Sequence, residues 1–261
     1  MADGSDGLDI RPQFAAMLDA IKASGVVASD EQIAAYEARQ RRDLRREALA
    51  SSGLHLPDDD RRMVLAGKLD RTKPACATVA TWARGAPKSG ASTVGCTPGI
   101  LVLCGGMGTG KTVAAAWWLS HVRGKAVTIH EAVRTYVAWK RAHGGRVLEE
   151  AKENLERLAR IDCLVLDELG QESDSDAEAA REVLHWIVDH RQSRYRRTLI
   201  ITNLSTSDLG DRFVRGIYDA RTADRLRTQG IVEQVLGESM RRPASIDATP
   251  RTRAVPRGER A

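Results

Sequence analysis

A glycine-rich segment lies between a short apolar run and an Ala-rich stretch of helical character. Its eight residues are Gly105, Gly106, Met107, Gly108, Thr109, Gly110, Lys111 and Thr112. Glycines let the backbone curl so that its N–H groups point at one anion, and the N-terminus of the following helix adds a favourable dipole. The spacing GxxxxGKT, between strand and helix, is that of the phosphate-binding P-loop. We therefore expect Lys111 to reach the β- and γ-phosphates of ATP and the Thr112 hydroxyl to coordinate Mg²⁺.

A second apolar run, Cys163–Leu166, ends in two acidic residues, Asp167 and Glu168. A carboxylate at the C-terminal end of a parallel strand lies on the ligand-binding edge of the sheet. Asp167 is thus expected to hold Mg²⁺, and Glu168 to act as general base on the attacking water. A strand that simply ends in acidic residues at the surface is the alternative. The P-loop some fifty residues earlier favours the nucleotide site.

Two weaker signals follow along the chain. The apolar run Leu199–Thr202 leads into Asn203, which could orient the lytic water or contact the γ-phosphate, although asparagine is also common in plain turns. Arg221 and Arg225 are four residues apart and share one helix face. An arginine delivered to a γ-phosphate stabilises the transition state. From spacing alone, an ordinary basic surface helix is the favoured interpretation of this pair.

Short apolar runs alternate with amphipathic stretches between residues 100 and 236, which predicts an α/β fold with a five-stranded parallel sheet covered by helices on both faces. The predicted strands are Ile100–Cys104, Ala126–Ile129, Cys163–Leu166, Leu199–Thr202 and Ile231–Val235. The predicted helices between them are Lys111–Arg123, Glu131–His143, Val147–Arg160, Asp176–Arg191 and Leu209–Arg227.

The flanking segments differ in composition from this α/β region. Residues 1–84 are expected to form a small helical region, with helices at Pro12–Ala23, Asp30–Ala50 and Pro74–Ala83 and a break at Leu56–Asp58. Residues 85–99 are rich in Gly, Ser, Thr and Pro and are expected to be a linker loop. Residues 242–261 form an Arg-rich tail in a chain with a net charge of +5. Two interpretations of this tail remain: a disordered segment and a segment that contacts nucleic acid.

Composition excludes several classes of protein. The four cysteines form no CxxC pair, so a zinc site is not expected, and buried thiols of a cytosolic protein fit better. The N-terminus lacks a basic segment followed by an apolar one, and no apolar run approaches the ~18–20 residues that span a bilayer. We expect a cytoplasmic protein with no membrane partner.

The order of these motifs resembles the AAA+ ATPases, a P-loop NTPase group of the ASCE class. More narrowly, it is similar to the DnaC-type helicase loaders and the related IstB-type transposition helpers. The residues that carry the resemblance are Gly105–Thr112, Leu164–Gln171, Ile187–Arg191, Thr202–Asn203 and the Arg221-x-x-Asp224-Arg225-Leu226 cluster. The resemblance covers residues 100–241, which it makes the ATPase domain, and it does not extend to a C-terminal lid domain after Val235.

The resemblance implies roles for individual residues. Asn203 would be a sensor of the γ-phosphate, and Arg225, with Arg221 nearby, would be an arginine finger that acts on ATP bound by a neighbouring subunit. The chain would therefore assemble into an oligomer with ATP sites at subunit interfaces. The helices between Glu131 and Arg160 resemble an element that lines a path for single-stranded DNA. Its candidate phosphate contacts are Lys140, Arg141 and Arg146, although a plain solvated charged face is equally open.

The function that the resemblance implies is hydrolysis of ATP, with Mg²⁺, to load the replicative DNA helicase onto single-stranded DNA. Residues 1–84 would then bind the helicase. An IstB-like helper of a DNA transposase is the nearest alternative. A nucleotide-dependent scaffold with little turnover conflicts with the intact Lys111, Asp167 and Glu168, and a small-molecule kinase would not need arginines that act between subunits.

Overall fold

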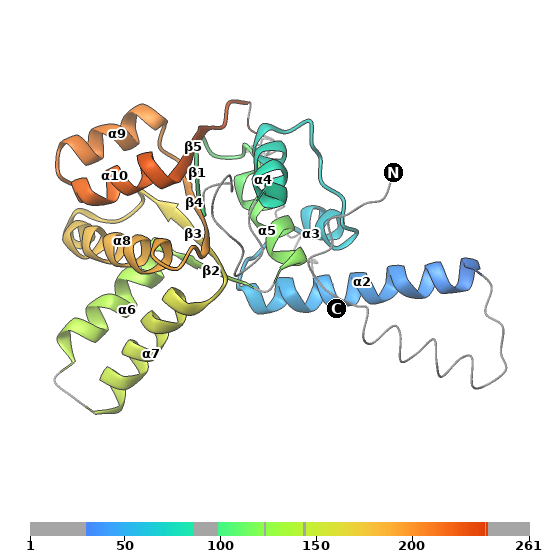
Figure 1. Cartoon of the computed structure of the whole chain (residues 1–261), viewed down its shortest axis with the longest axis horizontal. Coiled ribbons are helices and arrows are strands. Elements are labelled where there is room, and N and C mark those ends of the chain that lie inside the picture. Colours follow the sequence, from blue (N-terminus) through green and yellow to red (C-terminus); the bar gives the residue numbers. More distant parts are fainter. Residues whose placement is uncertain (1–29, 86–98, 123, 143–144, 238, 240–261) are drawn as a thin grey trace, which may run out of the picture.

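The structure is a computed structural model that describes residues 30–85, 99–122, 124–142, 145–237 and 239 (Figure 1). The expected helix Pro12–Ala23 and the basic tail, residues 242–261, lie outside the described residues. So does nearly all of the expected linker, residues 85–99. No helix in the described part of the chain is both long and apolar enough to cross a bilayer.

Five parallel strands form one sheet, which confirms the fold expected from the sequence. Their order in the sheet is β2-β3-β4-β1-β5. Strand β1 pairs with β4 and β5, so that Leu101 lies between Leu199 and Ile231. The strand bounds are β1 Ile100–Cys104, β2 Gly124–Thr128, β3 Cys163–Leu169, β4 Arg197–Thr202 and β5 Gly230–Gln234.

Helices cover both faces of this sheet, and alternate residues of each strand enter two separate cores. In β1, Leu101 and Leu103 face one core, whereas Ile100, Val102 and Cys104 face the other. On the first face lie α2 Asp30–Ser52, α3 Asp58–Leu65, α4 Pro74–Gly85 and α5 Lys111–His121. On the second face lie α6 Ile129–Arg141, α7 Arg146–Arg160, α8 Ala177–Gln192, α9 Thr206–Val214 and α10 Ala220–Gln229.

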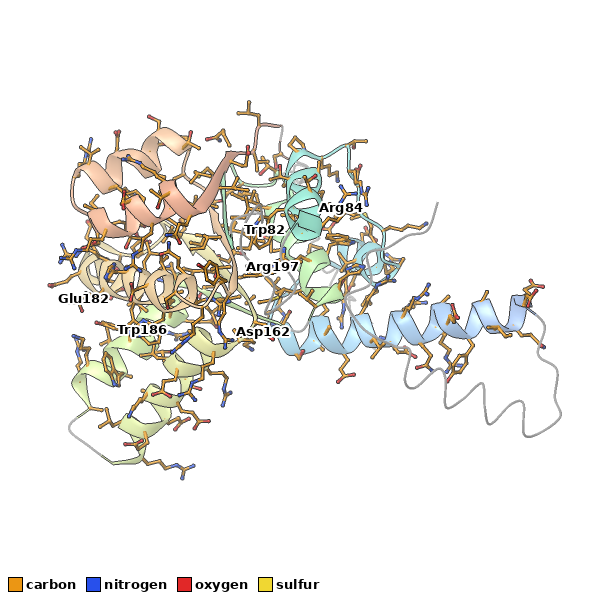
Figure 2. The ribbon with its side chains drawn as sticks, viewed as in Figure 1. Trp82, Arg84, Asp162, Glu182, Trp186 and Arg197 are labelled. Carbon is orange, nitrogen blue, oxygen red and sulfur yellow. The ribbon has the colours of Figure 1, made fainter. Side chains whose placement is uncertain are left out.

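The N-terminal helices share a core with the sheet. Trp82 of α4 packs edge-on against Trp118 of α5, with ring centroids 4.9 Å apart. The guanidinium of Arg197, at the start of β4, lies 4.4 Å from the Trp82 ring centroid, and the two side chains are labelled together in Figure 2. Buried residues of α3 and α4 thus belong to the same hydrophobic cluster as β1, β3 and β4. The assignment of residues 1–84 to partner binding stays a prediction.

The predicted helix Leu209–Arg227 is wrong, because the segment forms two helices, α9 and α10. Ser205 and Asp208 form a capping box that begins α9, and the Asp219 carboxylate accepts a hydrogen bond from a backbone N–H at the start of α10. The turn between them contains Gly216 with φ +72°, a left-handed conformation that glycine adopts without steric cost. The chain therefore reverses at residues 215–219.

Two smaller differences between the predicted and observed elements occur where helices begin. The predicted strand Ala126–Ile129 ends one residue early, because Thr128 and Glu131 form a capping box that makes Ile129 the first residue of α6. Helix α3, which the sequence did not predict, begins at Asp58, the last residue of the predicted break Leu56–Asp58. Pro57 precedes three aspartates in the first turn of α3, where negative charge is stabilised by the helix dipole.

Candidate nucleotide site

The P-loop connects β1 to α5 at the C-terminal edge of the sheet. Gly105, Gly108 and Gly110 adopt φ values of +145°, +82° and +85°. Residues that have a Cβ atom rarely adopt such positive values. The Gly105 N–H donates a 2.9 Å hydrogen bond to the Leu204 carbonyl. A Cβ atom on Gly105 would lie 2.4 Å from the Val235 carbonyl oxygen. The loop therefore needs glycine at its first position in order to pass between β4 and the end of β5.

Lys111 is buried and its ammonium lies within the curve of the loop. It donates hydrogen bonds to the carbonyls of Gly105 at 2.7 Å and Gly106 at 2.8 Å, and it lies 3.3 Å from the Thr109 hydroxyl. Burial lowers the pKa of the Lys111 ammonium, while the charge of Asp167 opposes this shift. The expected phosphate-binding lysine is thus held at the N-terminus of α5.

The Thr112 hydroxyl and the Asp167 carboxylate lie side by side. Thr112 Oγ1 is 3.3 Å from Asp167 Oδ2, although 55 residues separate the two in sequence. The other carboxylate oxygen accepts a 2.7 Å hydrogen bond from the Glu168 N–H. Burial raises the pKa of the Asp167 carboxyl. A hydroxyl and a carboxylate are ligands that Mg²⁺ accepts, with phosphate oxygens and waters completing its octahedral shell.

Glu168 has an unusual backbone conformation for a residue with a side chain, with φ +62°. It lies in a β-bulge of β3. Leu166 pairs with Ile200 and Leu169 with Thr202, so two residues of β3 oppose one of β4. Strand β3 thus extends three residues beyond the predicted end. Bulges and strained residues often occur beside functional sites, where they redirect a side chain. Here the Glu168 side chain is exposed at the edge of the sheet that also holds Lys111 and Asp167.

Asn203 lies in the loop that joins β4 to α9. The neighbouring Leu204 carbonyl accepts the hydrogen bond from Gly105, and the Thr202 hydroxyl donates a 2.6 Å hydrogen bond to the Leu169 carbonyl. This loop therefore contacts both the P-loop and the end of β3. Asn203 is half-buried in this loop, and its role near the γ-phosphate stays a prediction.

Arg221 and Arg225 lie elsewhere, on α10, which packs against α8. Arg221 is exposed, and Arg225 forms an ion pair with Asp189 of α8. Among the described residues, no hydrogen bond or ion pair joins either arginine to the P-loop of its own chain. The structure thus brings together the P-loop, Asp167, Glu168 and Asn203, and leaves the two arginines apart from them.

Sequence reasoning did not predict the burial of two charged residues, Glu172 beside this region and Arg191 at the opposite edge of the sheet. Arg191, at the C-terminal end of α8, is fully buried and donates to five acceptors. Burial lowers its pKa to about 9, which leaves the guanidinium charged at neutral pH. The Glu172 side chain is 1% exposed and pairs with Arg212. The local sequence does not signal either burial, because most partners of Arg191 are backbone carbonyls and the side-chain partners of Glu172 lie forty or more positions away.

Residues 97–248 match the family described as IstB-like ATP binding protein, and this segment is more than half of the chain. The chain belongs to this family. Its family name specifies ATP binding, and the matched segment contains the whole P-loop and Asp167. The fold, a five-stranded parallel sheet with a P-loop after β1, is that of a P-loop ATP-binding protein. No curated protein matches the chain.

Solved structures with similar folds include proteins of DNA replication. A candidate primosome component from Streptococcus pyogenes serotype M3 is 20% identical, with a TM-score of 0.50 over 72% of this chain and 93% of that one. The DnaC helicase loader is 17% identical, with a TM-score of 0.48 over 70% and 94% of the two chains. DnaI is 21% identical, with a TM-score of 0.43 over 77% and 93%. At these identities the similarity concerns the fold.

Proposed function

We propose that this chain is an ATP-hydrolysing AAA+ protein that acts on single-stranded DNA as a loader of a replicative helicase. The observation that carries the proposal is the 3.3 Å approach of Thr112 to Asp167, beside a lysine held inside the P-loop. These three side chains are the ones that a bound Mg²⁺–triphosphate requires at one place. The proteins of similar fold are consistent with a role in replication, and the family match is consistent with one in transposition.

Each site residue has a defined part in hydrolysis. Lys111 neutralises charge on the β- and γ-phosphates, and Thr112 and Asp167 hold Mg²⁺, which when bound further offsets the charge that develops on the phosphates. Glu168, exposed at the bulge, accepts a proton from the attacking water. Asn203 orients that water from the neighbouring loop.

The two arginines of α10 complete the site of a neighbouring subunit in this proposal. Arg221 is exposed, and Arg225 is half-buried against Asp189 in an ion pair at the surface, which costs little to open. Because neither contacts the P-loop of its own chain, assembly supplies the missing positive charge. ATP binding thus favours the oligomer, and hydrolysis releases it.

Helices α6 and α7 supply the proposed contact with DNA. They project from the sheet as an antiparallel pair in Figure 1. Lys140 and Arg141 lie on the exposed end of α6 and Arg146 begins α7, so all three are near the tip of the pair. The exposed Lys140 lies over the rings of Tyr136 and Trp139 and forms a long 3.9 Å ion pair with Glu182, a surface pair that costs little to exchange for a phosphate.

The test of hydrolysis between subunits uses two full-length variants. Lys111→Ala disables the P-loop of a protomer and keeps its arginines, whereas Arg225→Ala keeps the P-loop and removes the arginine. We expect each variant alone to have little ATPase activity and a mixture of the two to regain activity, since the first supplies an arginine to the second. Wild-type activity per protomer should also rise with protein concentration and with single-stranded DNA. An inactive mixture, with wild-type activity independent of concentration, would contradict the proposal.

The partner is tested with the tagged full-length chain incubated with a purified hexameric replicative helicase or with an IS21-type transposase. Capture of the helicase in an ATP-dependent manner supports the loader. Capture of the transposase alone supports the second candidate, a transposition helper, which the family match favours.

A further inference from the structure

A buried carboxylate, that of Glu172, lies four residues after Glu168 in the loop that follows β3. The side chain is 1% exposed, and its carboxylate accepts hydrogen bonds from three donors. Oε2 accepts a 2.8 Å bond from the Gly170 N–H, and Oε1 accepts a 2.7 Å bond from Arg212 and a short bond from the Tyr218 hydroxyl. A charge taken out of water is tolerated only when it is paired and hydrogen-bonded in this way.

On one side, this carboxylate fixes the loop that carries Glu168. Arg212 Nη2 also donates a 3.1 Å hydrogen bond to the Gly170 carbonyl, and the Gln171 N–H donates to the Glu168 carbonyl at 3.1 Å. The loop is therefore closed upon itself immediately after the bulge that holds Glu168 at φ +62°. Only one short turn separates Glu172 from Glu168, so a displacement of the Glu172 carboxylate also displaces Glu168.

On the other side, the same carboxylate fixes the start of α10. Arg212 comes from α9, and Tyr218 is in the turn that joins α9 to α10. Tyr218 is buried, and burial together with Glu172 raises the pKa of its phenol, so the hydroxyl remains a donor. The next residue, Asp219, caps α10 by accepting a 2.7 Å hydrogen bond from the Arg221 N–H. The position of α10 and of its arginines thus depends on Glu172.

We propose that Glu172 is a positioning residue that couples the two halves of an intersubunit ATP site. Through Gly170 it holds Glu168 in the site of its own chain, and through Arg212 and Tyr218 it holds the helix whose Arg221 and Arg225 serve the neighbour. A change at one site is thereby transmitted to the arginines presented at the next. This inference rests on the proposed function, because it requires that the α10 arginines act between subunits.

The first test measures the steady-state ATPase of full-length Glu172→Gln, which keeps the shape of the side chain and removes its charge. We expect kcat to fall about tenfold or more while KM for ATP stays within about twofold, since displacement of catalytic groups costs rate rather than ground-state binding. Tyr218→Phe, which removes one donor, should lower kcat less but in the same way. The control is Glu156→Gln, which breaks only an exposed ion pair with Arg160 on α7 and should leave both constants unchanged.

Thermal unfolding of each variant separates positioning from loss of fold. If Glu172→Gln does not fold, Tyr218→Phe carries the test, because a folded protein with wild-type kcat would overturn the proposal. So would a variant of either residue in which KM rises and kcat is unchanged. If Glu172 had only a structural role, its replacement would lower the fraction of folded, active protein but would leave kcat per folded site unchanged.

The second test places Glu172→Gln in one partner of the active mixture described above. In the Arg225→Ala protomer it disturbs the site that hydrolyses ATP, and in the Lys111→Ala protomer it disturbs only the donated arginine. We expect a loss of about tenfold in either placement. A loss in only one placement, or in neither, overturns the coupling. Failure of the unmodified mixture to regain activity refutes the proposed function itself, which distinguishes the two failures.

Discussion

Replacing Arg191 with methionine should destabilise the fold by about 3–5 kcal/mol, because it leaves several buried hydrogen-bond acceptors without their donor. The guanidinium donates to the Thr198 hydroxyl and to four backbone carbonyls, which come from the end of α7, the loop after it and the start of β4. Each acceptor left buried without a donor costs about 1–3 kcal/mol, and release of the buried charge offsets part of the sum. Methionine fills similar volume, so lost hydrogen bonds dominate the effect.

The assay is urea unfolding followed by circular dichroism, with thermal unfolding as a check. For a domain of this size we expect the unfolding midpoint to fall by about 6–20 °C, from about 2–4 °C per kcal/mol. The matched control is Arg196→Met, which removes an arginine whose ion pair with Asp162 lies at the surface, and it should cost under about 1 kcal/mol. If the two variants destabilise equally, the argument that Arg191 joins α7, α8 and β4 is refuted.

Glu168→Gln should keep ATP affinity and lower turnover by about 10²–10⁴-fold, as removal of a general base does, and equal turnover would exclude the assigned role. Gly105→Ala should lower stability by about 1–3 kcal/mol, because its Cβ would meet the Val235 carbonyl oxygen at 2.4 Å, whereas Gly106→Ala meets no atom within 4 Å and should be the milder change in thermal unfolding. The affinity for single-stranded DNA should fall steeply with salt, and the log–log slope should shrink by about 1 for each alanine variant of a phosphate contact, which fluorescence anisotropy measures. The variants are Lys140→Ala, Arg141→Ala and Arg146→Ala. An unchanged slope in all three would show that α6 and α7 do not contact the DNA.

The sheet could be predicted from sequence because each strand contains a short apolar run between stretches with helical periodicity, and the runs of β1, β3 and β4 are buried. The errors in the predicted elements lie where hydrophobic periodicity and a local helix-start or turn signal indicate different structures. Ile129 is apolar and buried, so it extends the pattern of β2, but the capping box of Thr128 and Glu131 assigns it to α6. Two glycines, Gly210 and Gly216, lie within the predicted helix Leu209–Arg227. Gly210 is inside α9, whereas the chain reverses around Gly216, and periodicity alone does not distinguish the two.

Part of the candidate site could likewise be predicted from the sequence, and part could not. The P-loop and Asp167 are adjacent to strand ends, and parallel strands bring their C-terminal ends to one edge, so sequence order and topology are enough to predict the Thr112–Asp167 approach. The bulge at Glu168 is not predictable in this way, because it depends on the register of β3 against β4. The burial of Glu172 depends on Arg212 and Tyr218, which α9 and the α9–α10 turn bring in from forty or more residues further along.

Binding of Mg²⁺–ATP to the full-length chain, measured by isothermal titration calorimetry, tests the account most directly. We predict saturable binding by the wild type that weakens without Mg²⁺, and loss of that binding in Lys111→Ala, whose ammonium lies inside the loop. Lys125→Ala, which removes the same charge from β2, should bind as the wild type does. Wild-type affinity in Lys111→Ala would contradict the claim that this loop holds the triphosphate.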